Sequence, residues 1–272
     1  MELRRGSELS PAQLTEAWNL GYTGYFVPIY FTEAQLSQWM EAGSFDLSRS
    51  LILMDGLTPA GFSFLGVRGR RGWIGGFGIA PDYRGRGLAA QLFQQHVDLC
   101  REEGLESVQL EVLVENWAQR VYSRAGFRIT RRLCILQGTL PRPESRAPVH
   151  QGDAARLLAH SPRLHGQFPP VWQREASSLN VSMPAQTDGL YAGPAEEPTG
   201  YVLFQAAPDR VRILDAAGGE AAAHALVQGL AARFPETVVS LVNEPEGSPF
   251  CRALLAAGCS EVRAQWEMLW NR

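Results

Sequence analysis

The sequence predicts an α/β chain of two domains, each with a mixed β-sheet flanked by helices. The first observation is a strand, a short glycine loop and a long helix within Trp73 to Glu103. The strands expected before it, Leu51 to Met54 and Ala60 to Val67, form an antiparallel meander. The strand after it, Val108 to Val114, should run parallel to the glycine-rich strand, because a helix joins them by a right-handed crossover. The second observation is a weaker echo of this order in residues 201 to 270.

The central segment begins with a glycine-rich strand, Trp73 to Ile79, which ends before Pro81 because proline has no N–H for a strand ladder. A helix is expected from Gly87 to Glu103, since apolar side chains recur at helical spacing. The residues on this stripe are Leu88, Leu92, His96 and Leu99. With no metal-like pairing among the dispersed histidines, His96 is expected to belong to the core or its rim.

The loop Asp82 to Gly87 carries the chemistry of this segment. Gly85 and Gly87 allow a tight turn with bare backbone N–H groups, and these lie at the positive end of a helix. Such a terminus binds anions, and Arg84 and Arg86 add positive charge. A pyrophosphate is the ligand that best fits the loop.

The remaining elements of the first half follow from local signals. Ser10 with Pro11 predicts a first helix, and the capping box of Thr32 and Gln35 predicts a second one. The link between these helices is rich in aromatic residues, which divide between core and pocket wall. A short helix is expected from Trp117 to Arg124, followed by a closing strand from Phe127 to Gln137.

Composition restricts the classes of function. The chain has 272 residues, enough for one large or two ordinary domains, and its net charge of -3 gives no electrostatic reason to expect nucleic acid. The four cysteines form no C-x-x-C pair, so neither a disulfide framework nor a zinc site is expected. Because no apolar run forms a signal core or a membrane span, we expect a soluble cytoplasmic protein that meets no membrane.

Several motifs resemble the GNAT superfamily of acyl-CoA-dependent N-acetyltransferases. Residues Arg84 to Ala89 fit its R-x-x-G-x-A signature, and Ile79-Ala80-Pro81 is similar to the V-x-P that precedes it. Leu110-Glu111-Val112 resembles the fifth-strand segment, and Tyr122 to Phe127 resembles the closing Y-x-x-x-G-F. The resemblance covers residues 50 to 137.

The resemblance implies two tandem GNAT-like domains, each a mixed central sheet flanked by helices. Residues 1–140 would be the active domain, 141–149 a linker and 150–272 a degenerate copy. It also implies direct transfer from acetyl-CoA, as co-substrate, to a primary amine of a small molecule or peptide, without metal. A monomer or homodimer is expected.

The resemblance assigns roles to individual residues. Tyr122 is the candidate acid for the leaving thiolate, and Glu111 is the candidate base, with Glu115 in reserve. Asn116 would contact the pantetheine arm, although it lies one residue closer to Tyr122 than in the family's usual spacing. Backbone groups of Phe77, Gly78 and Ile79 would bind the same arm, and Arg84, Gly85, Arg86, Gly87, Leu88 and Ala89 would hold the pyrophosphate.

Alternatives remain for each reading. The loop also fits the G-x-G-x-x-A of dinucleotide-binding folds, with Glu111 as the ribose contact, but four residues separate strand and glycine where that fold has almost none. Tyr122 could be a packing aromatic, and Glu111 could face solvent. From a different class, the chain could be a non-catalytic acyl-CoA-binding regulatory module.

The second half differs from the first at the expected phosphate loop. If the two helices are aligned through Leu92 and Leu226, the second loop lacks both arginines and has Glu220 where Arg86 stands. A carboxylate at a helix N-terminus would repel a pyrophosphate. The sequence therefore predicts one CoA per chain, bound by the first half.

Overall fold

The computed structural model describes residues 1–143 and 147–272, so residues 144–146 of the expected linker lie outside the described residues. The chain forms two compact units, Met1–Thr130 with Glu267–Arg272, and Arg131–Trp266. Strands β6 (Arg128–Thr139) and β12 (Ser260–Asn271) each begin in one unit and end in the other. The compact units thus divide the chain at Thr130, before the expected linker, and the chain's end belongs to the first unit.

The first unit is a mixed sheet with helices on both faces. Its strands follow the order β1-β2-β3-β4-β5, with β12 next after β5. The pairs β1–β2, β2–β3 and β3–β4 are antiparallel, whereas β4 and β5 are parallel, as the sequence predicts. The elements are β1 (Glu2–Arg5), η1 (Gly6–Glu8), α1 (Pro11–Gly21), α2 (Glu33–Gly43), β2 (Leu51–Asp55), β3 (Thr58–Arg68), β4 (Arg71–Ile79), η2 (Pro81–Tyr83), α3 (Leu88–Glu102), β5 (Ser107–Leu113) and α4 (Gln119–Arg124).

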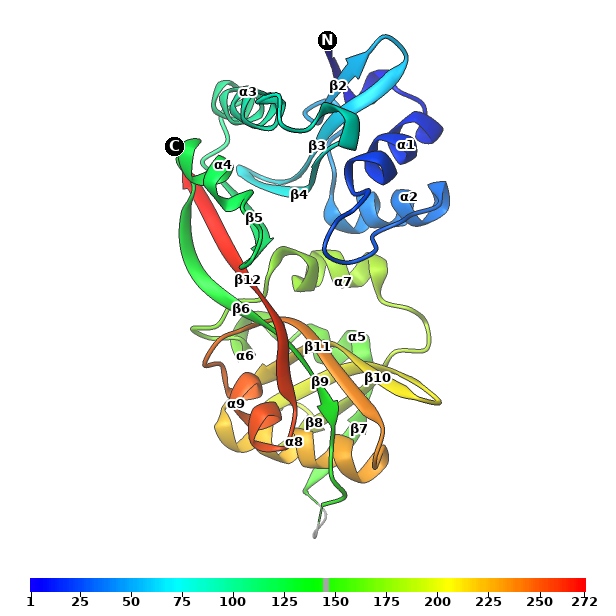
Figure 1. The fold of residues 1–272 in the computed structure, drawn as a ribbon. Helices are drawn as coiled ribbons and strands as arrows, with labels where there is room; N and C mark the ends of the chain where they lie inside the picture. Colours follow the sequence, from blue (N-terminus) through cyan, green and yellow to red (C-terminus); the bar gives the residue numbers. More distant parts are fainter. Residues whose placement is uncertain (144–146) are drawn as a thin grey trace. The chain divides into compact units, whose positions relative to one another are not determined.

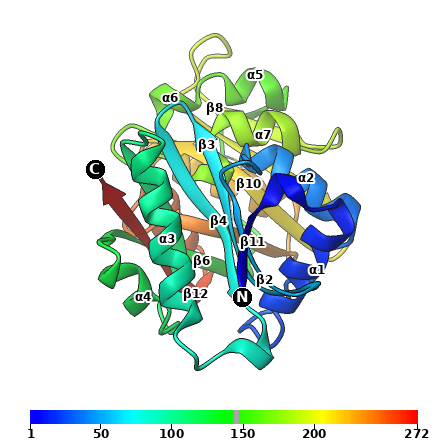
Figure 2. The same cartoon turned by 90° about the horizontal axis from the view of Figure 1, so that it is seen from above.

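Two apolar layers lie on opposite faces of this sheet, because successive side chains of a strand point to opposite sides. Ile52 and Met54 of β2 join the aromatic core under α1 and α2. Leu51 and Leu53 join the core under α3. Figures 1 and 2 show α1 and α2 on one side of β3 and β4, and α3 on the other.

The helix starts agree with the local signals in the sequence. Ser10 with Gln13 and Thr32 with Gln35 form reciprocal capping boxes at α1 and α2. His96 of α3 is fully buried, and its ring contacts the Ser63 hydroxyl at 2.5 Å and the Arg49 carbonyl at 2.9 Å. The predicted core position of this histidine is therefore confirmed.

The C-terminal end of β12 completes the first unit. The N–H of Arg272 donates to the carbonyl of Glu106 at 2.9 Å. The ring of Trp270 lies beside Gly126, where an added Cβ would be 3.3 Å from it. Gly126 also has φ +95°, a conformation that favours glycine. Residues more than a hundred positions apart thus close this sheet.

The second unit repeats the pattern of a mixed sheet with helices. Its strand order is β6-β11-β10-β9-β8-β7, with β12 beside β6. Strands β9 and β10 form an antiparallel hairpin, and α8 is an alanine-rich helix, in line with the echo expected in residues 201 to 270. Further elements are β7 (Val149–Gly152), α5 (Ala154–Leu158), α6 (Ser161–Leu164), η3 (Trp172–Arg174), α7 (Ala176–Ser182), β8 (Asp188–Ala192), β9 (Gly200–Ala207), β10 (Arg210–Gly218), α8 (Glu220–Arg233), β11 (Val238–Pro245) and α9 (Pro249–Ala256).

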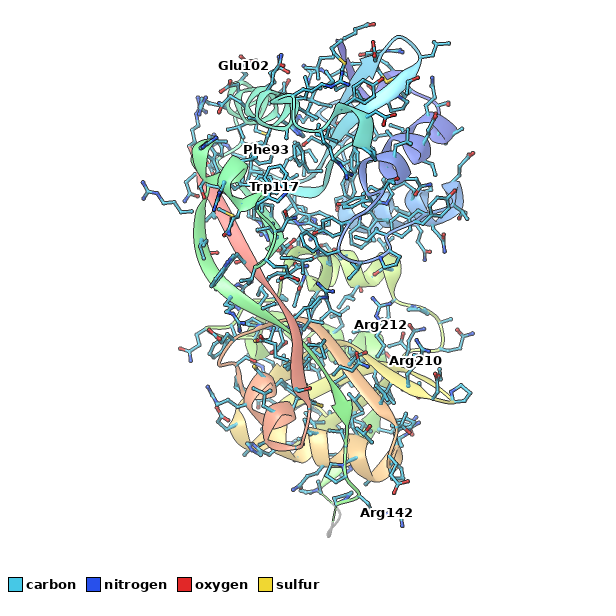
Figure 3. The ribbon with its side chains drawn as sticks, viewed as in Figure 1. Phe93, Glu102, Trp117, Arg142, Arg210 and Arg212 are labelled. Carbon is cyan, nitrogen blue, oxygen red and sulfur yellow. The ribbon has the colours of Figure 1, made fainter. Side chains whose placement is uncertain are left out.

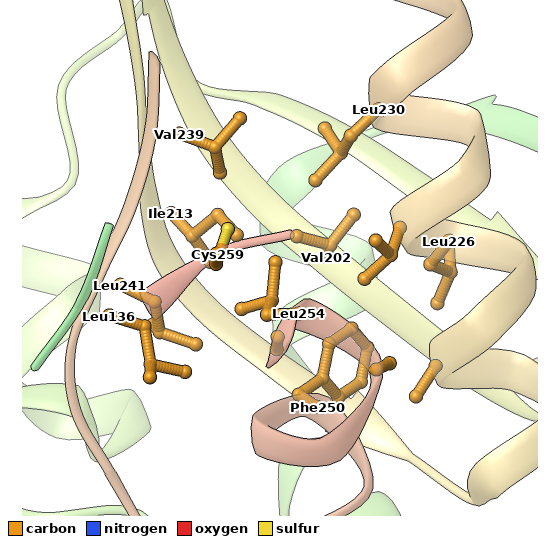
Figure 4. Packing of buried hydrophobic residues seen from close by; sticks show 14 of the residues in the cluster. Leu136, Val202, Ile213, Leu226, Leu230, Val239, Leu241, Phe250, Leu254 and Cys259 are labelled. Carbon is orange, nitrogen blue, oxygen red and sulfur yellow. The ribbon is translucent and has the colours of Figure 1, made fainter. Parts of the chain in front are cut away.

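A tight apolar core joins α8 and α9 to the strands of this unit. Leu226 and Leu230 of α8 pack against Val202 of β9, and Phe250 and Leu254 of α9 close the same layer (Figure 4). All five side chains are buried. In the part of the chain that the structure describes, no helix is long and apolar enough to cross a membrane.

Candidate functional site

Strands β4 and β5 are paired only at their beginnings. Their register runs from Arg71 opposite Ser107 to Trp73 opposite Gln109 and then stops. Gly75, two residues after Trp73, is left over in the β3–β4 pairing and forms a bulge. A bulge bends its strand and interrupts the ladder. The strand ends therefore diverge, and Ile74–Ile79 and Leu110–Leu113, here called the divergent segments, have no register with each other.

Glycine is required at the bulge because the sheet is crowded there. An added Cβ at Gly75 would overlap the rings of Trp73 and Phe45, and one at Gly76 would overlap the ring of Trp18. Gly75 and Gly76 therefore serve close packing and the bend rather than flexibility.

The glycine loop lies between the end of β4 and the start of α3. Gly85 and Gly87 have φ of +74° and +76°, so both residues depend on glycine's freedom in the left-handed region. Gly87 is the N-cap of α3 and no side chain caps the helix there. Because the N–H groups of a first turn have no intrahelical acceptor, this end of α3 offers donors to an anion.

The two arginines of the loop have different surroundings. The Arg84 guanidinium donates to the carbonyls of Ile79 at 2.8 Å, Gly21 at 3.2 Å and Thr23 at 2.7 Å. It therefore ties the end of β4 to the end of α1. The Arg86 side chain is exposed and lies 5.5 Å from the ring centroid of Tyr83. Of the two guanidinium groups, that of Arg86 is therefore the less constrained by its surroundings.

Tyr122 of α4 packs into the aromatic layer beside the divergent segments. Its ring centroid lies 4.6 Å from that of Phe93 and 5.9 Å from that of Phe77, and the residue is 7% exposed. Burial raises the pKa of Tyr122 well above its ordinary value, and the neighbouring Tyr22 and Tyr25 raise it further. The hydroxyl thus stays protonated at neutral pH and can act as a hydrogen-bond donor.

Glu111 of β5 is held by the opposite strand. The indole N–H of Trp73 donates to its carboxylate at 2.8 Å. Trp73 itself is 1% exposed and packs against Trp39 and Phe45, which fixes the indole in place. Glu111 is half-buried rather than pointing freely into solvent.

Asn116 and Trp117 follow β5 in the turn that leads into α4. The Asn116 side-chain oxygen accepts from the N–H of Ala118 at 2.9 Å, so it organises this turn. Trp117 is 63% exposed, whereas Phe93 of α3 is buried (Figure 3). The turn therefore presents one large aromatic side chain to solvent.

Tyr22 is a site residue that the sequence pattern does not single out. Burial raises the pKa of Tyr22 above its usual range, and the backbone of Phe77 acts in the opposite direction. Tyr22 therefore lies beside Phe77, one of the predicted backbone partners of a pantetheine arm. Nothing in the spacing of Tyr22 distinguishes it from the other aromatic residues of the α1–α2 link.

The predicted residues lie on consecutive elements of the first unit, from β4 to α4. Phe77–Ile79 end β4, the loop with Leu88 and Ala89 begins α3, and Glu111, Asn116 and Tyr122 lie on β5 and the following turn and helix. Within the described residues, no group of three or more His, Cys, Asp or Glu side chains is arranged to hold a metal ion.

The comparisons with known proteins agree with this arrangement. Residues 13–127 match the model of the acetyltransferase (GNAT) family. A segment of 64 residues is 38% identical to N-alpha-acetyltransferase 30 of Schizosaccharomyces pombe, and it covers 23% of this chain and 43% of that protein.

Several solved structures resemble the whole chain, and two of them illustrate the likeness. A GCN5-related N-acetyltransferase from Sphaerobacter thermophilus superposes with a TM-score of 0.67 at 17% identity, over 99% of this chain and 95% of that one. A tandem GNAT protein from the clavulanic acid biosynthesis pathway gives 0.63 at 11% identity, over 99% and 98%.

The fold of this chain is therefore similar to that of the tandem GNAT protein, with two α/β units of similar topology. The match to the acetyltransferase (GNAT) family, at residues 13–127, lies within the first unit.

Proposed function

We propose that the chain is an N-acetyltransferase that transfers the acetyl group of acetyl-CoA directly to a primary amine in a ternary complex. The observation that carries this proposal is the divergence of β4 and β5 after Trp73, beside the glycine–arginine loop at the start of α3. The unpaired strand edges can bind an extended amide-containing arm, and the loop can bind its pyrophosphate. Phe77, Gly78 and Ile79 would contact the arm, and Gly85 to Ala89 with Arg86 would hold the phosphates.

The reaction requires removal of a proton from the amine. A lysine-like amine is mostly protonated at neutral pH, and freeing it costs about 4–5 kcal/mol. In our proposal the Glu111 carboxylate, held by Trp73, takes this proton directly or through water. The amine nitrogen then bonds to the thioester carbonyl carbon, the carbon–sulfur bond breaks, and the nitrogen releases a second proton to solvent as the amide forms.

The leaving thiolate needs a hydrogen-bond donor. Its conjugate thiol has a pKa near 8.5, far below that of the buried Tyr122 hydroxyl, whose pKa is raised by burial. Full proton transfer from Tyr122 is therefore uphill. We assign Tyr122 the role of donating a hydrogen bond to the sulfur, with the proton finally supplied by solvent.

The acceptor class includes both small amines and peptides. The α-amino group of a peptide is included among the acceptors because the chain is similar to a protein called N-alpha-acetyltransferase 30. That match covers less than half of the relative, so we treat it as a reason to test peptide N-termini.

A screen that detects thiol release from acetyl-CoA tests the proposal against the alternative of a regulatory acyl-CoA-binding module. The panel contains small primary amines, lysine side chains and peptides with free or blocked N-termini. Amine-dependent thiol release supports an acetyltransferase. Saturable acetyl-CoA binding without turnover on any amine supports the binding module instead.

A further inference from the structure

The second unit contains a counterpart of the divergent strands. In β10 the residue left over in the pairing with β9 is Leu214, four positions after the first residue paired with β11. In β4 it is Gly75, likewise four positions after the first residue paired with β5. Strands β10 and β11 are parallel, and their register stops at Ile213 opposite Leu241. The two bulges therefore mark equivalent places.

Arg174 bridges the strands where they diverge in the second unit. Its guanidinium donates to Asp215 of β10 at 2.9 and 3.1 Å, and to Glu244 of β11 at 2.6 Å. A further contact reaches the carbonyl of Asn243 at 3.4 Å. Arg174 comes from η3, a segment that precedes β8 as the α1–α2 link precedes β2.

The carboxylates that meet Arg174 are buried and have further partners. Asp215 is 0% exposed and accepts from the Tyr201 hydroxyl at 2.5 Å, and the His165 ring nitrogen lies 3.1 Å from it. The Ser248 hydroxyl donates to Glu244 at 2.5 Å. Since a buried charge is costly unless it is paired, these contacts make the cluster one unit that resists separation.

The strands of the two units can be aligned from the first residues of their parallel pairs. The first unit then has no charged residue at the positions of Asp215 and Glu244. Asp215 corresponds to Gly76 and Glu244 to Leu113.

The loops that join strand and helix in the two units also differ in length. Eight residues, 80–87, separate β4 from α3, whereas Gly219 alone separates β10 from α8. The expected alignment of Glu220 with Arg86 is corrected, because Glu220 is already the first residue of α8: the described residues between β10 and α8 hold no counterpart of this loop.

From these contacts we infer that the Arg174–Asp215–Glu244 cluster is an internal lock that holds β10 and β11 together across their divergence. By holding these strands together, the lock prevents acyl-CoA from binding to the second unit. On the proposed function, acyl-CoA binds to the first unit. Glu220 at the start of α8 is already ion-paired with Arg252, so this helix end also offers no anion site. The chain therefore binds one acyl-CoA, and its second unit is a closed copy.

Hydrogen exchange of the full chain, with and without saturating acetyl-CoA, tests where the ligand binds. We expect slower exchange in residues 74–79, 84–91 and 110–113, and no change in residues 214–218 and 242–245. Ligand-dependent protection in the second pair of segments would overturn the lock and leave the proposed function intact. No protection anywhere would instead contradict the proposed function.

A second arm tests the lock without any ligand. The charge-free variant Arg174→Met/Asp215→Asn/Glu244→Gln avoids leaving a buried charge unpaired, whereas Arg174→Met alone leaves two carboxylates together and should lower the unfolding midpoint further. In the triple variant, exchange in 214–218 and 242–245 should rise by roughly tenfold or more, while Leu226–Leu230 of α8 stays as slow as in the wild type. If both strand segments keep their wild-type exchange, Arg174 does not hold them.

Discussion

The Trp73 indole N–H donates to the Glu111 carboxylate at 2.8 Å, across the last paired positions of β4 and β5. Trp73 is the final residue of β4 with a partner on β5, and Glu111 lies in the segment that diverges from it. The bond therefore fixes a carboxylate at the point where the two strands part.

The variant Trp73→Phe tests this positioning. The ring is kept and the N–H is lost, so the Glu111 carboxylate should become mobile and kcat should fall by about tenfold, within the range of general-base effects. KM for acetyl-CoA should stay the same. Glu111→Gln is the matched comparison and should lower kcat at least as much. If Glu111→Gln retains full kcat, the base is another group or water.

Tyr122→Phe should lower turnover about 10- to 1000-fold, in line with general-acid contributions. The buried ring still packs against Phe93 and Phe77, so the thermal midpoint and the acetyl-CoA affinity should hold. Tyr83→Phe is the control, because its exposed hydroxyl donates to the Asp55 carboxylate at 3.0 Å. Equal activity of the two variants would make Tyr122 a packing residue only.

Charge reversal at Arg84 and Arg86 of the glycine loop should distinguish an effect on acetyl-CoA binding from an effect on the stability of the fold. Arg86→Glu places a negative charge near the N-terminus of α3 and should weaken acetyl-CoA binding at least about tenfold without changing stability. Arg84→Glu should abolish binding and also lower the thermal midpoint, because three carbonyl contacts are lost. Calorimetric titration measures both affinities. Wild-type affinity in both variants would remove the pyrophosphate from this loop.

The buried His96 should make stability depend on pH. Burial lowers its pKa from 6.5 to about 4, although the hydrogen bond to the Arg49 carbonyl acts in the opposite direction. Above pH 6.5 the ring is neutral in both states and its contribution is fully present. As pH falls from 6.5 to about 4, the unfolded chain binds a proton that the folded chain excludes, so roughly 3 kcal/mol is lost.

Denaturant unfolding across this pH window checks the direction in which the stability changes with pH. His96→Gln keeps a donor and an acceptor but does not titrate, so its stability should fall less steeply than that of the wild type. Parallel curves for the two proteins would show that His96 is not the group responsible.

The sequence predicts the parts of the fold that have local signals. The stripe of Leu92, His96 and Leu99 defines α3, and the capping boxes at Ser10 and Thr32 define α1 and α2. Strands β1, β7 and β8 were not predicted, because four or five residues with little apolar alternation give no periodic signal. The return of Trp270 to the first unit depends on contacts between distant residues, which no local pattern contains.

The sequence likewise predicts only part of the candidate site. The glycines and arginines of the loop can be read from residue type and spacing, because helix termini and left-handed glycines have local rules. The Trp73–Glu111 bond and the role of Tyr22 require the sheet register. The Arg174 cluster joins residues 41 and 70 positions apart, so only the folded structure brings its charges together.

The most direct test of the proposed reaction follows the acetyl group itself. Acetyl-CoA carrying a labelled acetyl group is mixed with excess protein and an amine that supports thiol release, and the label is traced by mass spectrometry. We expect the label to move to the amine nitrogen at the rate of thiol release and never to appear on the protein. Label bound covalently to the protein before transfer, or label that stays on CoA with every amine, would contradict it.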